Sequence, residues 1–298
     1  MRVVLFGAGA SFGSGDVYPK PPPLGADLFP VLRRLYATWR EIPEALSNIF
    51  QKNFELGMAD VIEKHGFAIA PLMREMAIFF SIFGISKGAN NRYLKLVKAA
   101  ATHRDIVWSS LNYECLLEIA GSQLGHAINY FKDPAANGSK ELPVWKLHGS
   151  CNFRVTGLDA TRGVQFGTGV IFGGGIEPID PQKVREIYQG STALYPAMAL
   201  YAHKKPVSMS PAPIQEAQQR WAAHVRNSVR LVVVGVRPNP DDDHIWQPLA
   251  ETPGEVAYVG SKELFDEWSA KYRAPRPSLH LGESWSLCES ALAAYVTG

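Results

Sequence analysis

The chain has 298 residues, a formal net charge of +2 and three cysteines. Its 46 % hydrophobic and 19 % charged residues are typical of a soluble globular protein, and the length predicts one large domain with insertions or two domains. With the charges nearly balanced and no run of basic residues, direct binding of nucleic acid is not expected. Because no apolar stretch is long enough to span a bilayer and no targeting signal precedes the first strand, we predict a cytoplasmic protein that does not bind membranes.

The three cysteines, Cys115, Cys151 and Cys288, are far apart in the sequence. No C-x-x-C pair is present, so the chain cannot build a zinc site with four thiolates. We therefore expect buried, reduced thiols.

The first fifteen residues set the pattern for the chain. Residues 1–6 are an apolar run that suits a central parallel strand buried on both faces. The run Gly7-Ala8-Gly9-Ala10-Ser11 follows, and its small residues would let the backbone N–H groups approach a phosphate. An ordinary strand-to-loop turn is the alternative. Phe12 replaces the third glycine of the G-x-G-x-x-G pattern and prolines follow, which disfavours a plain Rossmann dehydrogenase and predicts a loop where that class has a helix.

The rest of the chain alternates between helical and strand patterns. From 25 to 102 only helical spacing is present, so this stretch is predicted to be a helical insertion between the first two strands. Residues 151–212 are predicted to form a smaller insertion with short strands and many loops. The expected helices within the first insertion are 43–57, 58–65, 68–84 and 90–102, after one that begins near 25. The later strands are expected at 105–108, 127–130, 143–147, 231–235, 256–259 and 279–281, with later helices at 213–228, 261–271 and 285–296.

This alternation predicts one α/β domain over 1–298, built on a doubly wound parallel sheet of the Rossmann-like kind. Polar clusters directly follow four of the predicted strands. The clusters are Gly7–Ser11, Ser110–Glu114, His148–Ser150 and Arg237–His244. Because the carboxyl ends of parallel strands meet at one edge, where such sheets bind ligands, we expect a single site there.

Two residues of these clusters could carry chemistry. The amide of Asn112 can hold a sugar hydroxyl or a water, although an asparagine capping a helix that begins at Tyr113 is the alternative. A neutral His148 can take a proton from a hydroxyl, although it could also be a structural histidine bonded to the backbone. The run Asp241–His244 is expected to be a solvated or hydrogen-bonding loop, because consecutive residues rarely point at one ion. No metal site is predicted.

Taken in order, the clusters resemble the sirtuin-like superfamily. The run Gly7–Ser11 resembles its phosphate-binding GAG-x-S motif, and Leu111-Asn112-Tyr113-Glu114 is similar to its (T/S)-x-N-(Y/I)-D motif. Leu147-His148-Gly149-Ser150 resembles its catalytic L-H-G motif. Val234-Gly235-Val236-Arg237 resembles its late G-(T/Y)-S element, and Val259-Gly260-Ser261 falls where its adenosine-side strand ends. The resemblance implies a sirtuin-type sheet.

The departures from the family pattern separate this chain from the protein deacylases. Residues 13–19 lack the deacylase G-I-P-D-F-R stretch, and the zinc module of four cysteines is absent. Glu114 replaces the usual Asp, and Val236 replaces a small polar residue. The Pro-Pro-Leu-Gly-Ala-Asp-Leu run at 22–28 and the helical insertion resemble the bacterial branch that destroys NAD in antiphage defence.

The resemblance implies that NAD is a substrate whose nicotinamide–ribose bond is hydrolysed, with Asn112 and His148 as catalytic residues. It also implies restraint by a homo-oligomer or a regulatory partner protein, with 25–102 as a candidate lid or oligomer face. A deacylase that uses NAD and a silent regulatory module that binds NAD or ADP-ribose are the alternatives. The residues implied to bind NAD are Gly7, Ala8, Gly9, Ala10, Ser11, Tyr113, Glu114, Gly235, Val236, Arg237, Gly260 and Ser261.

Overall fold

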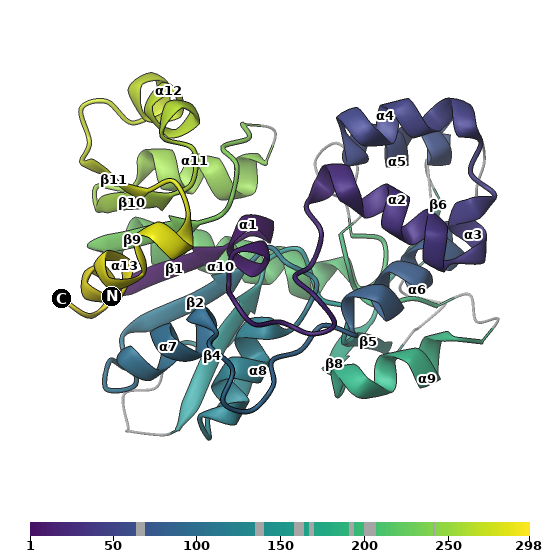
Figure 1. Ribbon diagram of the computed structural model, residues 1–298, viewed down its shortest axis with the longest axis horizontal. Coiled ribbons are helices and arrows are strands. Elements are labelled where there is room, and N and C mark those ends of the chain that lie inside the picture. The colour runs from purple at the N-terminus through teal and green to yellow at the C-terminus, as the bar shows by residue number, and fades with distance from the viewer. Residues whose placement is uncertain are drawn as a thin grey trace.

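A seven-stranded sheet forms the centre of the computed structural model (Figure 1). Every strand pair in it is parallel, and the strand order is β11-β10-β9-β1-β2-β4-β3. The strands are β1 (Arg2–Phe6), β2 (Ile106–Ser110), β3 (Ala127–Tyr130), β4 (Glu141–Lys146), β9 (Arg230–Val234), β10 (Glu255–Val259) and β11 (Ser278–Gly282). The doubly wound α/β fold predicted from the sequence is confirmed. The structure describes residues 1–63, 69–134, 140–157, 164–166, 170–190, 194–199, 207–240 and 242–298.

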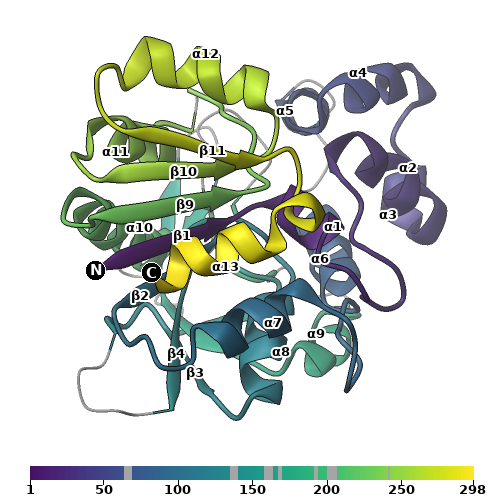
Figure 2. The same ribbon diagram turned by 60° about the vertical axis from the view of Figure 1, so that its left-hand side comes forward.

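Helices cover both faces of the sheet, as Figure 2 shows. Because successive side chains of a strand point to opposite faces, Val4 and Phe6 join one hydrophobic core while Val3 and Leu5 join the other. The first core contains α7 (Arg92–Ala99), α8 (Leu116–Gln123) and α13 (Glu289–Thr297). The second contains α10 (Pro211–Arg226), α11 (Asp243–Glu251) and α12 (Lys262–Tyr272).

Strand β1 is the point at which the winding of the sheet reverses. The chain leaves β1 for β2 on one side and later returns to place β9 on the other side. The register pairs Phe6 with both Ser110 and Val234, so the three strands end level with one another. Ligands of open parallel sheets bind beyond the carboxyl ends of the strands at this kind of reversal.

Short helices fill the chain between β1 and β2, and Figures 1 and 2 both place α2–α6 beyond the end of the sheet at which β1 ends. The helix expected over 43–57 is interrupted at Asn53, whose extended backbone ends one helix while its Oδ1 accepts the amides of Glu55 and Leu56. The segment contains α2 (Gly25–Leu35), α3 (Ala37–Arg40), the 3₁₀ turn η1 (Glu44–Leu46), α4 (Ser47–Lys52), α5 (Phe54–Glu63) and α6 (Ile69–Phe80). No helix in the described ranges is long and apolar enough to cross a membrane.

A second group of short elements follows β4. In it, β5 (Phe153–Thr156) pairs antiparallel with β8 (Gly175–Pro178), and β6 (Val164–Phe166) pairs with β7 (Val170–Phe172). Short strands and many loops were expected over 151–212, and the structure adds the turn η2 (Pro181–Lys183) and the helix α9 (Val184–Tyr188). Elements of only three to five residues are too short to show a helical or strand period in the sequence, and prolines and glycines interrupt the pattern further.

Candidate functional site

The turn after β1 differs from the expected loop. Residues Ala8–Phe12 form the five-residue helix α1, and the irregular connector begins only at Gly13. The prediction of a loop directly after the glycines is therefore wrong. The prolines lie too far along the chain to prevent this single helical turn.

Glycines bring the turn after β1 into contact with the turn after β9. The amides of Gly7 and Gly9 donate to the carbonyls of Val234 and Gly235, each at 2.9 Å. Gly235 has a φ of +65°, and a Cβ added to it would lie 2.1 Å from the Ala10 nitrogen. The glycines therefore serve close backbone packing. Their amides are engaged inside the protein instead of facing outward toward a phosphate.

A buried hydrogen-bond network fixes Ser11 and Asn112. The amide nitrogen Nδ2 of Asn112 donates to the Gly7 carbonyl at 3.0 Å and to Ser11 Oγ at 2.9 Å. Ser11 Oγ in turn donates to Glu114 Oε1 at 2.5 Å. Helix α8 begins at Leu116, and its first amide donates to Glu114 Oε2 at 2.7 Å, so Glu114 caps the helix. The alternative in which Asn112 caps a helix beginning at Tyr113 is wrong.

Tyr93 completes this network from the insertion side. Its hydroxyl lies 2.9 Å from Ser11 Oγ, and its side chain is 1 % exposed. Burial, reinforced by the negative charge of Glu114, raises the pKa of Tyr93 well above its ordinary value, so the phenol stays neutral. The sequence analysis missed this residue because Tyr93 has the spacing of an ordinary core position of α7.

His148 meets a second histidine across the carboxyl edge of the sheet. Its Nε2 lies 3.0 Å from Nε2 of His244, which belongs to α11. His148 follows β4 whereas α11 follows β9, and two strands, β1 and β2, separate these in the sheet. Strands β9 and β4 are therefore three strand spacings apart, and at about 4.8 Å per spacing the two loops bridge about 14 Å. Their contact therefore lies across the edge at which the Gly7–Ser11 turn and Asn112 end.

The loop that carries His148 is tightly packed. His148 is 3 % exposed, and the next residue, Gly149, has a φ of +74°. A Cβ on Gly149 would lie 1.9 Å from the carbonyl oxygen of Ala197, so only glycine fits there. This packing fixes the backbone of His148.

Other residues that were predicted to bind NAD lie at the same edge, and some of them are buried whereas others are exposed. Tyr113 is buried, and its hydroxyl donates to the Ala199 carbonyl at 2.9 Å. The carbonyl of Val236 accepts from Tyr258, while Arg237 is exposed. Gly260 and Ser261 follow β10, and Ser261 Oγ accepts the Leu264 amide at the start of α12. Asp241 lies outside the described residues, and among those described no group of three metal-ligating side chains occurs.

A buried ion pair lies beneath Asn112 and His148. Lys146, the last residue of β4, has its Nζ 3.3 Å from Glu118 Oε1 and 2.6 Å from the Glu114 carbonyl that accepts its hydrogen bond. Burial opposes the charge of Lys146, but the nearby carboxylates, Glu118 first, outweigh burial and raise its pKa. Burial also raises the pKa of Glu118. The two loops of the site therefore rest on a desolvated pair of charges.

The predicted state of the cysteines is confirmed, since all three are free and buried. Cys115 Sγ lies 4.0 Å from Cys151 Sγ. The contact with Cys151, together with burial, raises the pKa of the Cys115 thiol well above its ordinary value. The Cys115 thiol therefore packs as a neutral side chain.

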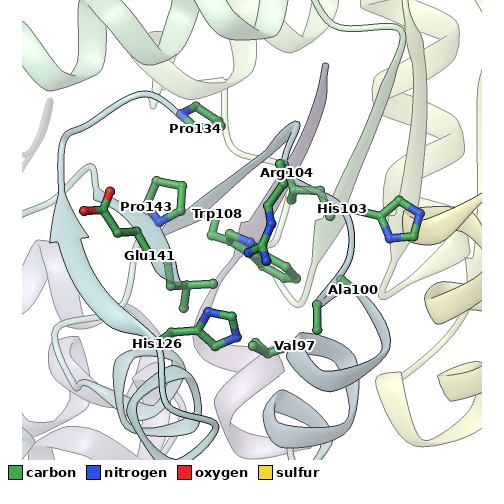
Figure 3. Close-up of a pocket in the computed structure, with 12 residues that line it drawn as sticks. Val97, Ala100, His103, Arg104, Trp108, His126, Pro134, Glu141 and Pro143 are labelled. Atoms are coloured by element: carbon green, nitrogen blue, oxygen red, sulfur yellow. The ribbon is translucent and has the colours of Figure 1, made fainter. Parts of the chain in front are cut away.

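A small pocket of about 20 Å³ lies elsewhere, near the amino ends of β2 and β4 (Figure 3). His103, Arg104 and His126 line it together with Trp108. None of the predicted site residues lines this pocket.

Comparison with known proteins leaves the family of the chain open. No protein-family model and no curated protein matches the sequence. Among solved structures, a serine-to-alanine mutant of a Sir2 homologue in complex with ADP-ribose aligns with 99 % of this chain and 91 % of that chain, at 14 % identity and a TM-score of 0.45. What the chain's own topology establishes is an α/β protein of the Rossmann-like class with its polar clusters at the switch strand.

The contact between the two glycine turns predicts a specific cost for a methyl group. Gly235→Ala adds a clash with Ala10 to the strain of a positive φ, whereas Gly125→Ala adds only the strain, because no atom lies within 4 Å of its new Cβ. We expect Gly125→Ala to lower the free energy of unfolding by about 1–2 kcal/mol and Gly235→Ala to lower it by about 1–3 kcal/mol more. Urea denaturation of both variants measures this difference, and equal losses would contradict the packing described.

The ion pair beneath the site predicts non-additive mutations. Lys146→Met leaves Glu118 as an uncompensated buried charge and should lower the free energy of unfolding by about 3–5 kcal/mol. The double variant Lys146→Met/Glu118→Gln removes both charges and should recover part of that loss. Lys262→Met, which breaks an exposed pair, should cost less than about 1 kcal/mol. A double variant less stable than Lys146→Met in urea would contradict the coupling.

Proposed function

We propose that the chain is a sirtuin-like NAD hydrolase that cleaves the nicotinamide–ribose bond and releases nicotinamide and ADP-ribose. The observation that carries the proposal is that the Gly7–Ser11 turn, Asn112 and His148 follow the carboxyl ends of the neighbouring strands β1, β2 and β4, with Asn112 bonded to Gly7. The order of their motifs along the chain supports the same class.

The arrangement of strands suits an extended dinucleotide. Gly235, Val236 and Arg237 follow β9 and Gly260 and Ser261 follow β10, so they lie on one side of β1. Asn112 and His148 follow β2 and β4 on the other side. We therefore assign the adenosine half of NAD to the first side and the nicotinamide half to the second. The diphosphate would cross the surface of the Gly7–Ser11 turn, whose exposed residues are small, with the exposed Arg237 as its cation.

The proposed reaction does not need a general acid. Nicotinamide leaves as a neutral molecule from a cationic pyridinium, so no proton has to be supplied to it. The transition state at the ribose carbon resembles an oxocarbenium ion, and the enzyme must hold the ribose and stabilise the positive charge. In this proposal Asn112 positions the ribose or the attacking water, and His148 takes the proton from that hydroxyl or water.

We extend the proposal to the biological role that the motifs suggest, depletion of NAD in bacterial antiphage defence. Such an activity has to be restrained, and α2–α6 lie beyond the same edge of the sheet as the site. These helices are the proposed lid or contact face for a second copy or a regulatory partner. Sedimentation of the purified chain with and without NAD, compared with its activity over the same concentrations, tests whether assembly controls turnover.

The catalytic assignment predicts loss of turnover in two variants. Asn112→Ala and His148→Ala should each slow release of nicotinamide from NAD by about 10²–10⁴-fold. To measure this, each purified protein is incubated with NAD, and the nicotinamide and ADP-ribose released are quantified by chromatography. Because Asn112 also holds Ser11 and Gly7, thermal denaturation of each variant must show that it remains folded.

Two surface variants serve as matched controls. His103 lies in the connector before β2, and Asn227 ends α10, both away from the carboxyl edge. His103→Ala and Asn227→Ala should leave the rate unchanged. Activity that survives in both Asn112→Ala and His148→Ala contradicts the assignment, whereas NAD binding without any release of nicotinamide by the unaltered chain indicates a regulatory binding module.

A further inference from the structure

The loop after the first turn, Gly13–Tyr18, is held by the last part of the helical insertion. We propose that Asn91, in that part of the insertion, is the positioning residue of the loop: it fixes the loop as a preformed wall of the NAD site, so that the ligand does not have to order it. This proposal deepens the function proposed above and rests on it. Asn91 itself is not assigned a contact with NAD.

The place of the loop in the chain makes it a wall of the site. It begins just after the Gly7–Ser11 turn, to which the diphosphate is assigned, and it leads from α1 to the helices α2–α6 (Figures 1 and 2). A ligand that lies on the first turn therefore has this loop as its neighbour.

The composition of the loop predicts flexibility, but its packing opposes it. Gly13 and Gly15 flank Ser14, and glycines lose more conformational freedom on folding than other residues. Yet Gly15 has a φ of +100°, and a Cβ added to it would lie 2.4 Å from the carbonyl oxygen of Asn90. The backbone of the loop thus packs directly against the insertion, and only glycine fits at this point.

The backbone of the loop is also hydrogen-bonded to the segment between α6 and α7. The amide of Arg92 donates to the Ser14 carbonyl at 2.7 Å. The amides of Tyr18 and Gly84 each donate to the carbonyl of the other residue, at 2.9 and 3.0 Å. Because both partners of each bond belong to the chain itself, the loop needs no ligand to order it.

Asn91 ties the middle of the loop to the insertion. Its side chain is fully buried, and its Nδ2 donates to Ser14 Oγ and to the Asp16 carbonyl, each at 3.2 Å. Its Oδ1 accepts the Tyr93 amide at 2.9 Å, so the same side chain caps α7. The two N–H groups of this amide and its oxygen therefore all have partners, and losing the donors would leave buried acceptors unsatisfied.

Ser14 passes this constraint to the first turn. Its Oγ donates to the Ser11 carbonyl at 3.0 Å, and Ser14 is fully buried as well. The hydroxyl of Ser11 accepts from Asn112 and meets the hydroxyl of Tyr93, whose amide is the one that Asn91 caps. Asn91 therefore supports Ser11 through Ser14 on one side and through the start of α7 on the other.

The start of the loop has an anchor of its own. Arg92 Nη1 donates to the Gly13 carbonyl at 2.9 Å, and Arg92 Nε lies 3.1 Å from a carboxylate oxygen of Glu289 in α13. A change at Asn91 should therefore release residues 14–18 while the start of the loop stays attached to the core. Because a loop that has to be ordered on binding costs affinity, this release should weaken the binding of NAD.

Hydrogen exchange tests the fixation of the loop without turnover. Asn91→Ser keeps an oxygen that can cap α7, but its side chain is too short to donate to both Ser14 and Asp16. The amides of residues 14–18 should exchange about 10-fold faster in this variant, because the buried partners of the lost donors are left unsatisfied. Asn227→Ser, at the end of α10, is the matched control and should leave this exchange unchanged.

A binding test measures the consequence for the site. With ADP-ribose as a ligand that is not consumed, calorimetry should give a Kd about 10-fold higher for Asn91→Ser than for the unaltered chain. For release of nicotinamide from NAD, KM should rise about 10-fold while kcat changes less than about 3-fold, as expected when only uniform binding is lost. A role in stability alone would leave KM unchanged in the folded variant.

Ser14→Ala tests the same contact from the other side. It removes the acceptor of Asn91 with a smaller change of volume, so it decides the question if Asn91→Ser does not fold. Exchange and Kd should rise in this variant too. The double variant should show less than the product of the two single effects, because the two changes share one hydrogen bond.

These tests separate failure of the inference from failure of the proposed function. If both variants exchange like the unaltered chain, or if the unaltered loop becomes protected only when ADP-ribose is added, the inference is overturned while the NAD hydrolase stands. A released loop with unchanged Kd and KM overturns it as well. If the unaltered chain binds neither ADP-ribose nor NAD, the proposed function fails together with the role of the loop in it, and the exchange rates still show whether Asn91 fixes the loop.

Discussion

The hydroxyl of Ser11 joins the parts of the candidate site. It accepts a hydrogen bond from Asn112, donates one to Glu114 and meets the hydroxyl of Tyr93, and all of these contacts are within 3.0 Å. These partners come from the end of β2, the start of α8 and the insertion helix α7. In a buried, low-dielectric setting such a network is strong when complete and costly when broken. The position of Asn112 over the first turn therefore depends on the Ser11 hydroxyl together with the Gly7 carbonyl.

The topology explains why this network lies where a ligand would bind. Because the winding reverses at β1, the chain continues to opposite sides of this strand, and the turns after β1 and β9 touch directly. That contact uses the amides of Gly7 and Gly9, so the turn offers a smooth backbone surface instead of a ring of donors. His148 and His244 then close over the same edge from strands on opposite sides. In the proposed function, recognition of NAD at this site would rest on shape, on Arg237, on Asn112 and on His148.

The sequence was sufficient to predict the sheet, because most of its strands are short apolar runs and polar clusters follow four of them. It also predicted that Asn112 and His148 lie at one edge of the sheet, since the carboxyl ends of parallel strands lie together. It could not predict that Asn53 divides a helix, because an asparagine at a helical position has the same pattern whether it continues the helix or caps the next one. The helix α1 was missed because the downstream prolines suggested an earlier break.

Contacts over long sequence separations were beyond reach for a different reason. Tyr93 and Ser11 are 82 residues apart, and His148 and His244 are 96 apart. Neither pair belongs to a local motif. Tyr93 follows the apolar stripe of its helix, and His244 follows three aspartates that suggest a solvated loop. Their roles emerge only when the strand order and the path of the loops are known.

The crystal structure of the His148→Ala variant with NAD is the measurement that bears most directly on the site. That variant should hold uncleaved NAD with its diphosphate across the Gly7–Ser11 turn and its nicotinamide ribose beside Asn112. A dinucleotide bound away from this edge of the sheet would contradict the location of the site. Cleaved NAD in those crystals would contradict the role of His148.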